Sequence, residues 1–119
     1  MNLYLITYSS LYALFSVIGA ALIKSAINAY GKLITASDYI QLLLNWKVIL
    51  GFLIIFGSSL VLFKALSQFE YSKVIPISIG INFILTTTIG YYVFGELLSL
   101  VGLVGIFVIL IGIILLAFS

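Results

Sequence analysis

A row of polar side chains interrupts the third of four apolar stretches in the chain. Ser78, Asn82 and Thr86 recur at every fourth residue, so on a helix they share one face. An amide near the middle of a bilayer is costly unless it is paired. Two interpretations follow and both stay open. The row either bonds neighbouring helices together or lines a groove for the polar part of a substrate.

Hydroxyl groups also mark one face of the first apolar stretch. Tyr12 and Ser16 lie on this face together with Ser9 and Gly19. The Ser16 hydroxyl could instead bond its own helix backbone. The candidate substrate pathway is therefore formed by Tyr12, Ser16, Ser78, Asn82 and Thr86.

Charged side chains are few and lie near the ends of the apolar stretches. Lys24 and Lys73 mark boundaries, and Lys64 lies about one turn inside the second stretch, from which a long side chain can reach the interface. Each lysine could instead contact an anionic head group or phosphate. Glu96 precedes the fourth stretch, where a carboxylate would complement the positive end of the helix dipole; proton coupling is the alternative role.

The composition excludes several classes of protein. The 119 residues are 65% hydrophobic and 7% charged, with a mean hydropathy of +1.41, so they cannot build the polar shell of a soluble fold. We therefore expect an integral membrane protein without a nucleic-acid partner. The chain contains no His and no Cys. We expect no catalytic centre, no metal site and no cofactor.

The apolar stretches predict a single all-α domain, a bundle of four transmembrane helices. Each stretch approaches the roughly 20 residues that cross a bilayer. The predicted spans are residues 3–23, 48–66, 74–93 and 97–118. The first span lacks a basic leader and is predicted to be retained. A short interfacial helix is predicted over residues 36–45, because Thr35 and Asp38 have the spacing of a capping box.

The fourth stretch is suited to helix packing. Gly105 and Gly112 are seven residues apart and face the same way, and Gly102 lies almost beside them. Small residues on one face let two membrane helices approach closely. We expect this helix to carry a dimer contact. Lysines divide three to two between the two predicted sides of the membrane, which leaves the orientation open.

Three segments resemble the small multidrug resistance proteins of the drug/metabolite transporter superfamily. They are residues 16–24 (SVIGAALIK), residues 94–99 (FGELLS), and the Gly105 and Gly112 pair. The resemblance covers nearly the whole chain and implies a dimeric transporter in a prokaryotic inner membrane. The multidrug proteins carry an essential Glu where this chain has Ser16, and their drug-site Tyr and Trp correspond to Ile75 and Ser78. Proton/cation antiport is therefore not expected here.

The pattern is more similar to a second branch, the small flippase subunits that move undecaprenyl-phosphate-aminoarabinose. Those subunits lack the same Glu and share the Ser16 to Gly19 pattern, Pro76, Asn82 with Phe83, and Glu96. The resemblance implies transport of an amphipathic or lipid-linked polar-headed molecule by a homodimer, or by a heterodimer with a related small protein. A multidrug or small-metabolite exporter and a non-transporting membrane subunit remain the alternatives.

Overall fold

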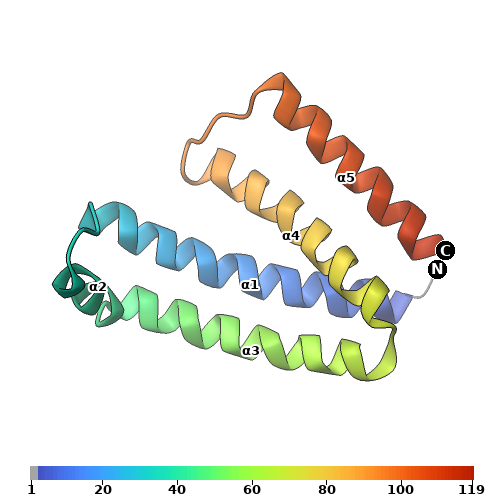
Figure 1. The fold of residues 1–119 in the computed structure, drawn as a ribbon, viewed down its shortest axis with the longest axis horizontal. Helices are drawn as coiled ribbons and strands as arrows, with labels where there is room; N and C mark the ends of the chain where they lie inside the picture. The colour runs from blue at the N-terminus through green and yellow to red at the C-terminus, as the bar shows by residue number, and fades with distance from the viewer. Residues whose placement is uncertain (1–2) are drawn as a thin grey trace.

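The structure, a computed structural model, describes residues 3–119 and is a bundle of helices. Helices α1 and α3 lie side by side, α4 crosses α1, and α5 packs mainly against α4 (Figure 1). The elements are α1 (Leu3–Tyr30), α2 (Ala36–Leu43), α3 (Trp46–Gln68), α4 (Tyr71–Tyr92) and α5 (Leu100–Phe118). The described residues contain no strand, which confirms the all-α fold class.

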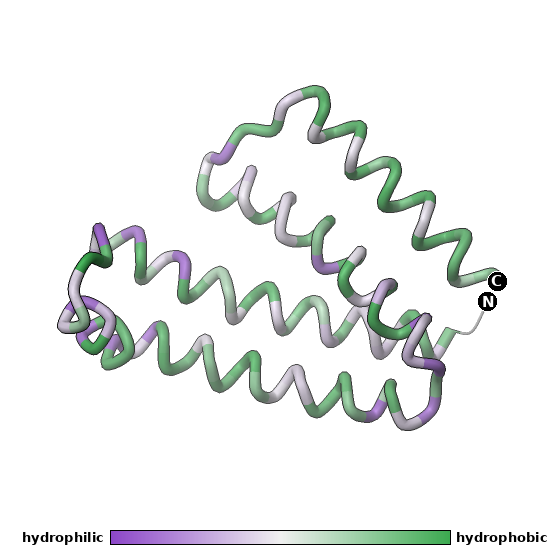
Figure 2. Tube along the Cα trace, viewed as in Figure 1, coloured by the Kyte–Doolittle hydropathy of each residue, from purple (hydrophilic) through white to green (hydrophobic). Residues whose placement is uncertain are grey.

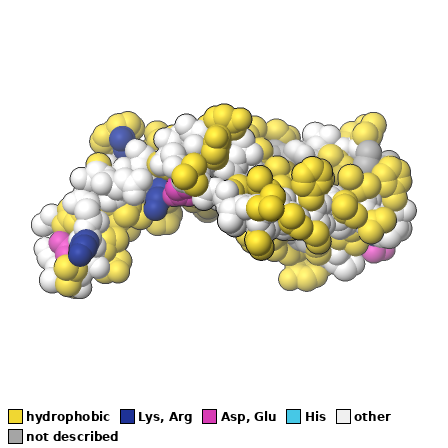
Figure 3. Space-filling model, turned by 90° about the horizontal axis from the view of Figure 1, so that it is seen from above, with side chains coloured by type: hydrophobic (Ala, Val, Ile, Leu, Met, Phe, Trp, Pro, Cys, Tyr) yellow, Lys and Arg dark blue, Asp and Glu magenta, His cyan; other side chains and the backbone are white. Residues whose placement is uncertain are grey.

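Four of these helices are long and apolar enough to cross a membrane: α1, α3, α4 and α5. Along the chain trace, α5 is almost uniformly hydrophobic, whereas polar residues recur along α4 (Figure 2). Hydrophobic side chains also cover much of the face seen from above (Figure 3). Leu97 and Val101 are 87% and 81% exposed. Such an apolar exterior is suited to lipid and not to water, so the fold is that of a multi-pass membrane protein.

Helix α1 is longer than the predicted span. Its 28 residues would extend about 42 Å at 1.5 Å per residue, whereas a hydrocarbon core is about 30 Å thick. The predicted span ends at residue 23, whereas the helix continues past Lys24 to Tyr30. Lys24 is the one charged residue of α1.

The capping box before α2 is confirmed. The Thr35 hydroxyl accepts from the Asp38 N–H at 3.4 Å, and the Asp38 carboxylate accepts from the Thr35 N–H at 3.0 Å. The same carboxylate accepts from the Tyr30 hydroxyl at 2.7 Å, which ties α2 to the end of α1. The backbone donor of Thr35, then the Tyr30 hydroxyl, lower the pKa of Asp38 to about 2. Helix α2 ends at Leu43, before the predicted residue 45, because Asn45 instead caps α3.

The tightest helix contact joins α1 and α3. A Cβ placed on Gly19 would lie 2.7 Å from the Gly51 carbonyl oxygen, and a Cβ on Gly51 would lie 2.7 Å from the Gly19 carbonyl oxygen. Only glycine fits at both positions, so the two backbones come into direct contact. The α1/α3 pair is the most extensive helix contact, followed by α1 with α4.

Helix α5 is the least enclosed of the four long helices. It packs on α4 where a Cβ at Gly80 would collide with Ile113. A Cβ at Gly105 or at Gly112 would meet no atom within 4 Å. The space beside Gly105 and Gly112 is therefore open within the described chain, and the predicted dimer contact stays a prediction.

Candidate functional site

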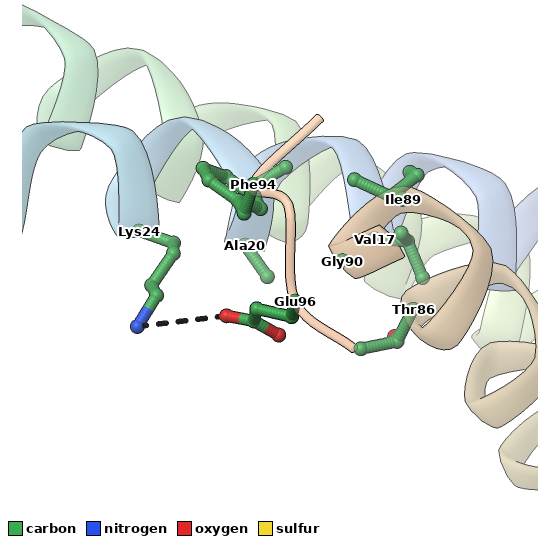
Figure 4. A pocket seen from close by; sticks show the side chains of 9 residues that line it. Val17, Ala20, Lys24, Thr86, Ile89, Gly90, Phe94 and Glu96 are labelled. Atoms are coloured by element: carbon green, nitrogen blue, oxygen red, sulfur yellow. Dashed lines mark ion pairs between the residues drawn. The ribbon is translucent and has the colours of Figure 1, made fainter. Parts of the chain in front are cut away.

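A pocket of about 270 Å³ opens between α1, α4 and the connector that follows α4. Figure 4 shows side chains from all three segments around it. The lining residues are Val17, Ala20, Ala21, Lys24, Thr86, Ile89, Gly90, Phe94 and Glu96. Most of the wall is apolar, and the polar groups come from one lysine, one threonine and one glutamate. The pocket is therefore amphipathic.

The connector after α4 folds back over the end of that helix. Gly95 has a φ of +67°, in the left-handed region that favours glycine. The reversal lets the Glu96 N–H donate to the Gly90 carbonyl at 2.9 Å. The Glu96 side chain is thereby brought to the pocket.

The expectation that Glu96 occupies the N-terminus of the last helix is wrong. Helix α5 begins at Leu100, and Ser99 is its N-cap, with a hydroxyl that accepts from the Gly102 N–H at 3.1 Å. Both residues precede the same apolar run, but only Ser99 has the extended backbone of a cap directly before the first helical residue. Gly102 consequently lies in the first turn of α5, beside Leu98 and Ser99.

An ion pair spans the pocket. The Lys24 Nζ lies 4.0 Å from the Glu96 Oε1, and the two side chains are 49% and 59% exposed. They point toward each other across the opening (Figure 4). The separation exceeds the 2.7–2.9 Å typical of a charge-assisted hydrogen bond. An exposed pair of this length is weak and is screened by salt, so both charges stay accessible to a ligand.

A chain of hydrogen bonds runs between α1 and α4 from the wall of this pocket. Thr86, which lines the pocket, donates to the Asn82 side-chain oxygen at 3.1 Å. The Asn82 amide nitrogen donates to the Ser16 hydroxyl at 3.4 Å. Three of the five predicted pathway residues are therefore connected. This arrangement satisfies the Asn82 amide, and it also places polar groups in sequence from the pocket toward the middle of α4.

The other two predicted pathway residues do not take part in this series of hydrogen bonds. Ser78 is buried, and its hydroxyl has no hydrogen-bond partner among the described residues. Tyr12 is half-buried on α1 and does not line the pocket. The hydroxyl of Ser9, on the same helix, is likewise buried without a partner in the described chain.

The three lysines predicted to contact phosphate are not brought together. Lys24 lines the pocket, whereas Lys64 is exposed on α3 and lies outside it. Lys73 donates to the Ser119 carbonyl oxygen at 2.7 Å, near the other end of the bundle. Of the three, Lys24 alone lines the pocket from which the hydrogen bonds of Thr86, Asn82 and Ser16 lead.

Six of the nine lining residues were not predicted from the sequence, and the spacing of polar residues pointed to two of them. Gly90 continues the row of Ser78, Asn82 and Thr86 by one more step of four residues. Ala20 likewise lies midway between Ser16 and Lys24. The row from Ser16 leads to Lys24 and the row from Ser78 leads to Gly90, and these two end residues both line the pocket.

The described residues contain no group of His, Cys, Asp or Glu that could hold a metal ion. The chain matches no protein-family model, no curated protein and no solved structure. The fold and the pocket therefore define the class: a small helical membrane protein with an amphipathic pocket that carries one cation and one anion.

Proposed function

We propose that this protein is a small membrane transporter or flippase that moves an amphipathic molecule with a polar, anionic head. One observation carries the proposal: an apolar-walled pocket with a lysine at its rim leads into the Thr86, Asn82 and Ser16 chain. A phosphate could contact Lys24, other polar groups of the head could replace hydrogen bonds along the chain, and an apolar tail could remain against the lipid-facing surface.

The resemblance to the small flippase subunits supports the same function and suggests a polyprenyl-phosphate-linked sugar as the substrate. We propose a prokaryotic inner membrane as its location, in keeping with the same resemblance. We propose that the working unit is a homodimer, or a heterodimer with a related small protein. A Cβ at Gly105 or at Gly112 would meet no atom within 4 Å in the described chain, so this face of α5 is open to a second helix. We propose that the protein is not an enzyme and uses no cofactor.

Transport of a labelled lipid in proteoliposomes tests this proposal. The substrate is a polyprenyl phosphate with a fluorescent head that dithionite quenches in the outer leaflet only. We expect Lys24→Gln to slow transbilayer movement about tenfold, the loss of one charge-assisted contact. Asn82→Leu should also slow transbilayer movement, because it removes the hydrogen bonds of Asn82 with Ser16 and with Thr86.

Lys64→Gln is the matched control, because it removes the same charge from an exposed site outside the pocket. We expect its rate to equal that of the unmodified protein. Equal rates for the Lys24 and Lys64 variants, together with full activity of Asn82→Leu, would contradict the proposed pathway.

Export of organic cations is a second candidate, favoured by the half-exposed Glu96 carboxylate in the same pocket. This function would follow the multidrug type, with Glu96 in place of the carboxylate that Ser16 replaces. Binding of a cationic dye that is lost in Glu96→Gln and retained in Lys24→Gln would favour it over the lipid substrate.

A further inference from the structure

Glu96 is held in its position by the backbone around it. Its N–H donates to the Gly90 carbonyl at 2.9 Å, and Gly95 provides the left-handed turn that this contact requires. The carboxylate therefore lies against the last turn of α4, on the side of the pocket (Figure 4). The ion pair with Lys24 results from a defined local structure.

Gly90 is the residue that makes room for this carboxylate. It is buried, and a Cβ placed on it would lie 2.9 Å from the Glu96 Oε2. Any larger side chain must push the carboxylate away from α4. Gly90 is thus a positioning residue for Glu96.

Lys24 is the one cation, and Glu96 the one anion, among the residues that line the pocket. Their separation of 4.0 Å and their exposure leave the ammonium group incompletely satisfied. A phosphate or carboxylate that reaches the lysine at hydrogen-bond distance would form shorter contacts than Glu96 does. It would have to move Glu96 aside, because like charges at one cation repel each other.

We infer that Glu96 is an internal competitor for the anion site at Lys24, held in place by Gly90, and that an anionic amphiphile binds by displacing it. This inference rests on the proposed function, because it assumes that the pocket takes an anionic head. Lys24 is paired with a group of the protein itself, and binding exchanges one anion for another. The pocket therefore favours ligands whose anion contacts the lysine more closely than Glu96 does.

Dodecyl phosphate is a suitable probe, and its binding can be followed by NMR of the full chain in maltoside micelles. The amide signals of Gly90 and Glu96 report on the pocket. We expect Glu96→Gln to tighten binding about two- to five-fold, the range of an exposed ion pair. Gly90→Ala should also change the affinity, because its Cβ must displace the Glu96 carboxylate. Lys24→Gln should weaken binding about tenfold or more.

Matched controls separate the pocket from the overall charge. Glu70→Gln removes the same charge from the exposed N-cap of α4, which makes no side-chain capping bond. Gly57→Ala adds a methyl group where no atom lies within 4 Å. We expect both to bind dodecyl phosphate as the unmodified protein does. Helix content from circular dichroism verifies that each variant is folded, and Glu96→Gln tests the inference even if Gly90→Ala does not fold.

The outcomes distinguish the competitor role of Glu96 from the proposed function. If binding depends on Lys24 but Glu96→Gln leaves it unchanged or weakens it, the competitor role is wrong while the proposed anion site stands. If dodecyl phosphate does not bind any of the variants, the proposed function itself fails. Equal binding of inorganic phosphate would replace the lipid-like substrate with a soluble anion, and binding of dodecyltrimethylammonium that requires Glu96 would replace the anion site with a cation site.

Discussion

The contact between Gly19 and Gly51 provides the sharpest test of how the bundle is held together. Replacing Gly19 with alanine places a Cβ 2.7 Å from the Gly51 carbonyl oxygen and 2.6 Å from Ile55 Cγ1. The isoleucine side chain can rotate away, but the carbonyl belongs to the backbone of α3 and can move only if the helices separate. The substitution therefore tests the direct approach of two backbones.

The expected size follows from two opposing effects. Alanine stabilises a helix by about 1 kcal/mol relative to glycine, whereas overfilling a packed contact costs about 1–3 kcal/mol. Gly57→Ala is the matched control in the same bundle, because its Cβ would meet no atom within 4 Å. The control experiences the first effect alone, so the free energies of unfolding of the two variants should differ by about 1–3 kcal/mol.

Unfolding by increasing dodecyl sulfate in mixed micelles, followed by far-UV circular dichroism, measures this difference. Gly51→Ala should behave like Gly19→Ala, because its Cβ would lie 2.7 Å from the Gly19 carbonyl oxygen. If Gly19→Ala and Gly57→Ala have the same free energy of unfolding, the backbones of α1 and α3 are not in contact, and the reasoning from the glycine pair is refuted.

Two further predictions concern the ends of the helices and the outer face. The pKa of Asp38 is lowered from 3.8 to about 2, so its ionised carboxylate stabilises α2 fully above pH 4, and this stabilisation is lost as the pH falls through about 2. A carbon-13 titration of the Asp38 carboxyl should show this low midpoint. A midpoint near 4 would contradict the hydrogen bonds at the cap. Gly112→Ile should convert the proposed dimer to monomers in native mass spectrometry. Gly57→Ala, at a glycine of α3 whose Cβ would meet no atom within 4 Å, should not. An unchanged dimer in Gly112→Ile would place the interface elsewhere.

The helices could be predicted from the sequence because long apolar runs have few alternatives in a membrane. The start of α2 could be predicted for a local reason, since Thr35 and Asp38 satisfy each other across three residues. Both features depend on neighbours in the sequence. The structure accordingly confirms the four long helices and the capping box.

The position of Glu96 could not be predicted, because it depends on contacts between segments. The sequence places two polar residues, Glu96 and Ser99, before the last apolar run, and either could cap a helix. Only the turn at Gly95 and the hydrogen bond to the Gly90 carbonyl decide that the carboxylate returns to α4. The sequence likewise does not decide whether Lys24 or Lys64 reaches a pocket. The packing of α4 on α1 determines that Lys24 does.

The order of the helix contacts has a consequence for biogenesis. The glycine contact joins α1 and α3, which leave the ribosome before α4 and α5, and it needs no residue of those two later helices. This helical hairpin can close while the rest of the chain is still being translated. Helices α4 and α5 then join a template that is already formed, and the pocket is completed only when the connector carrying Glu96 has been synthesised.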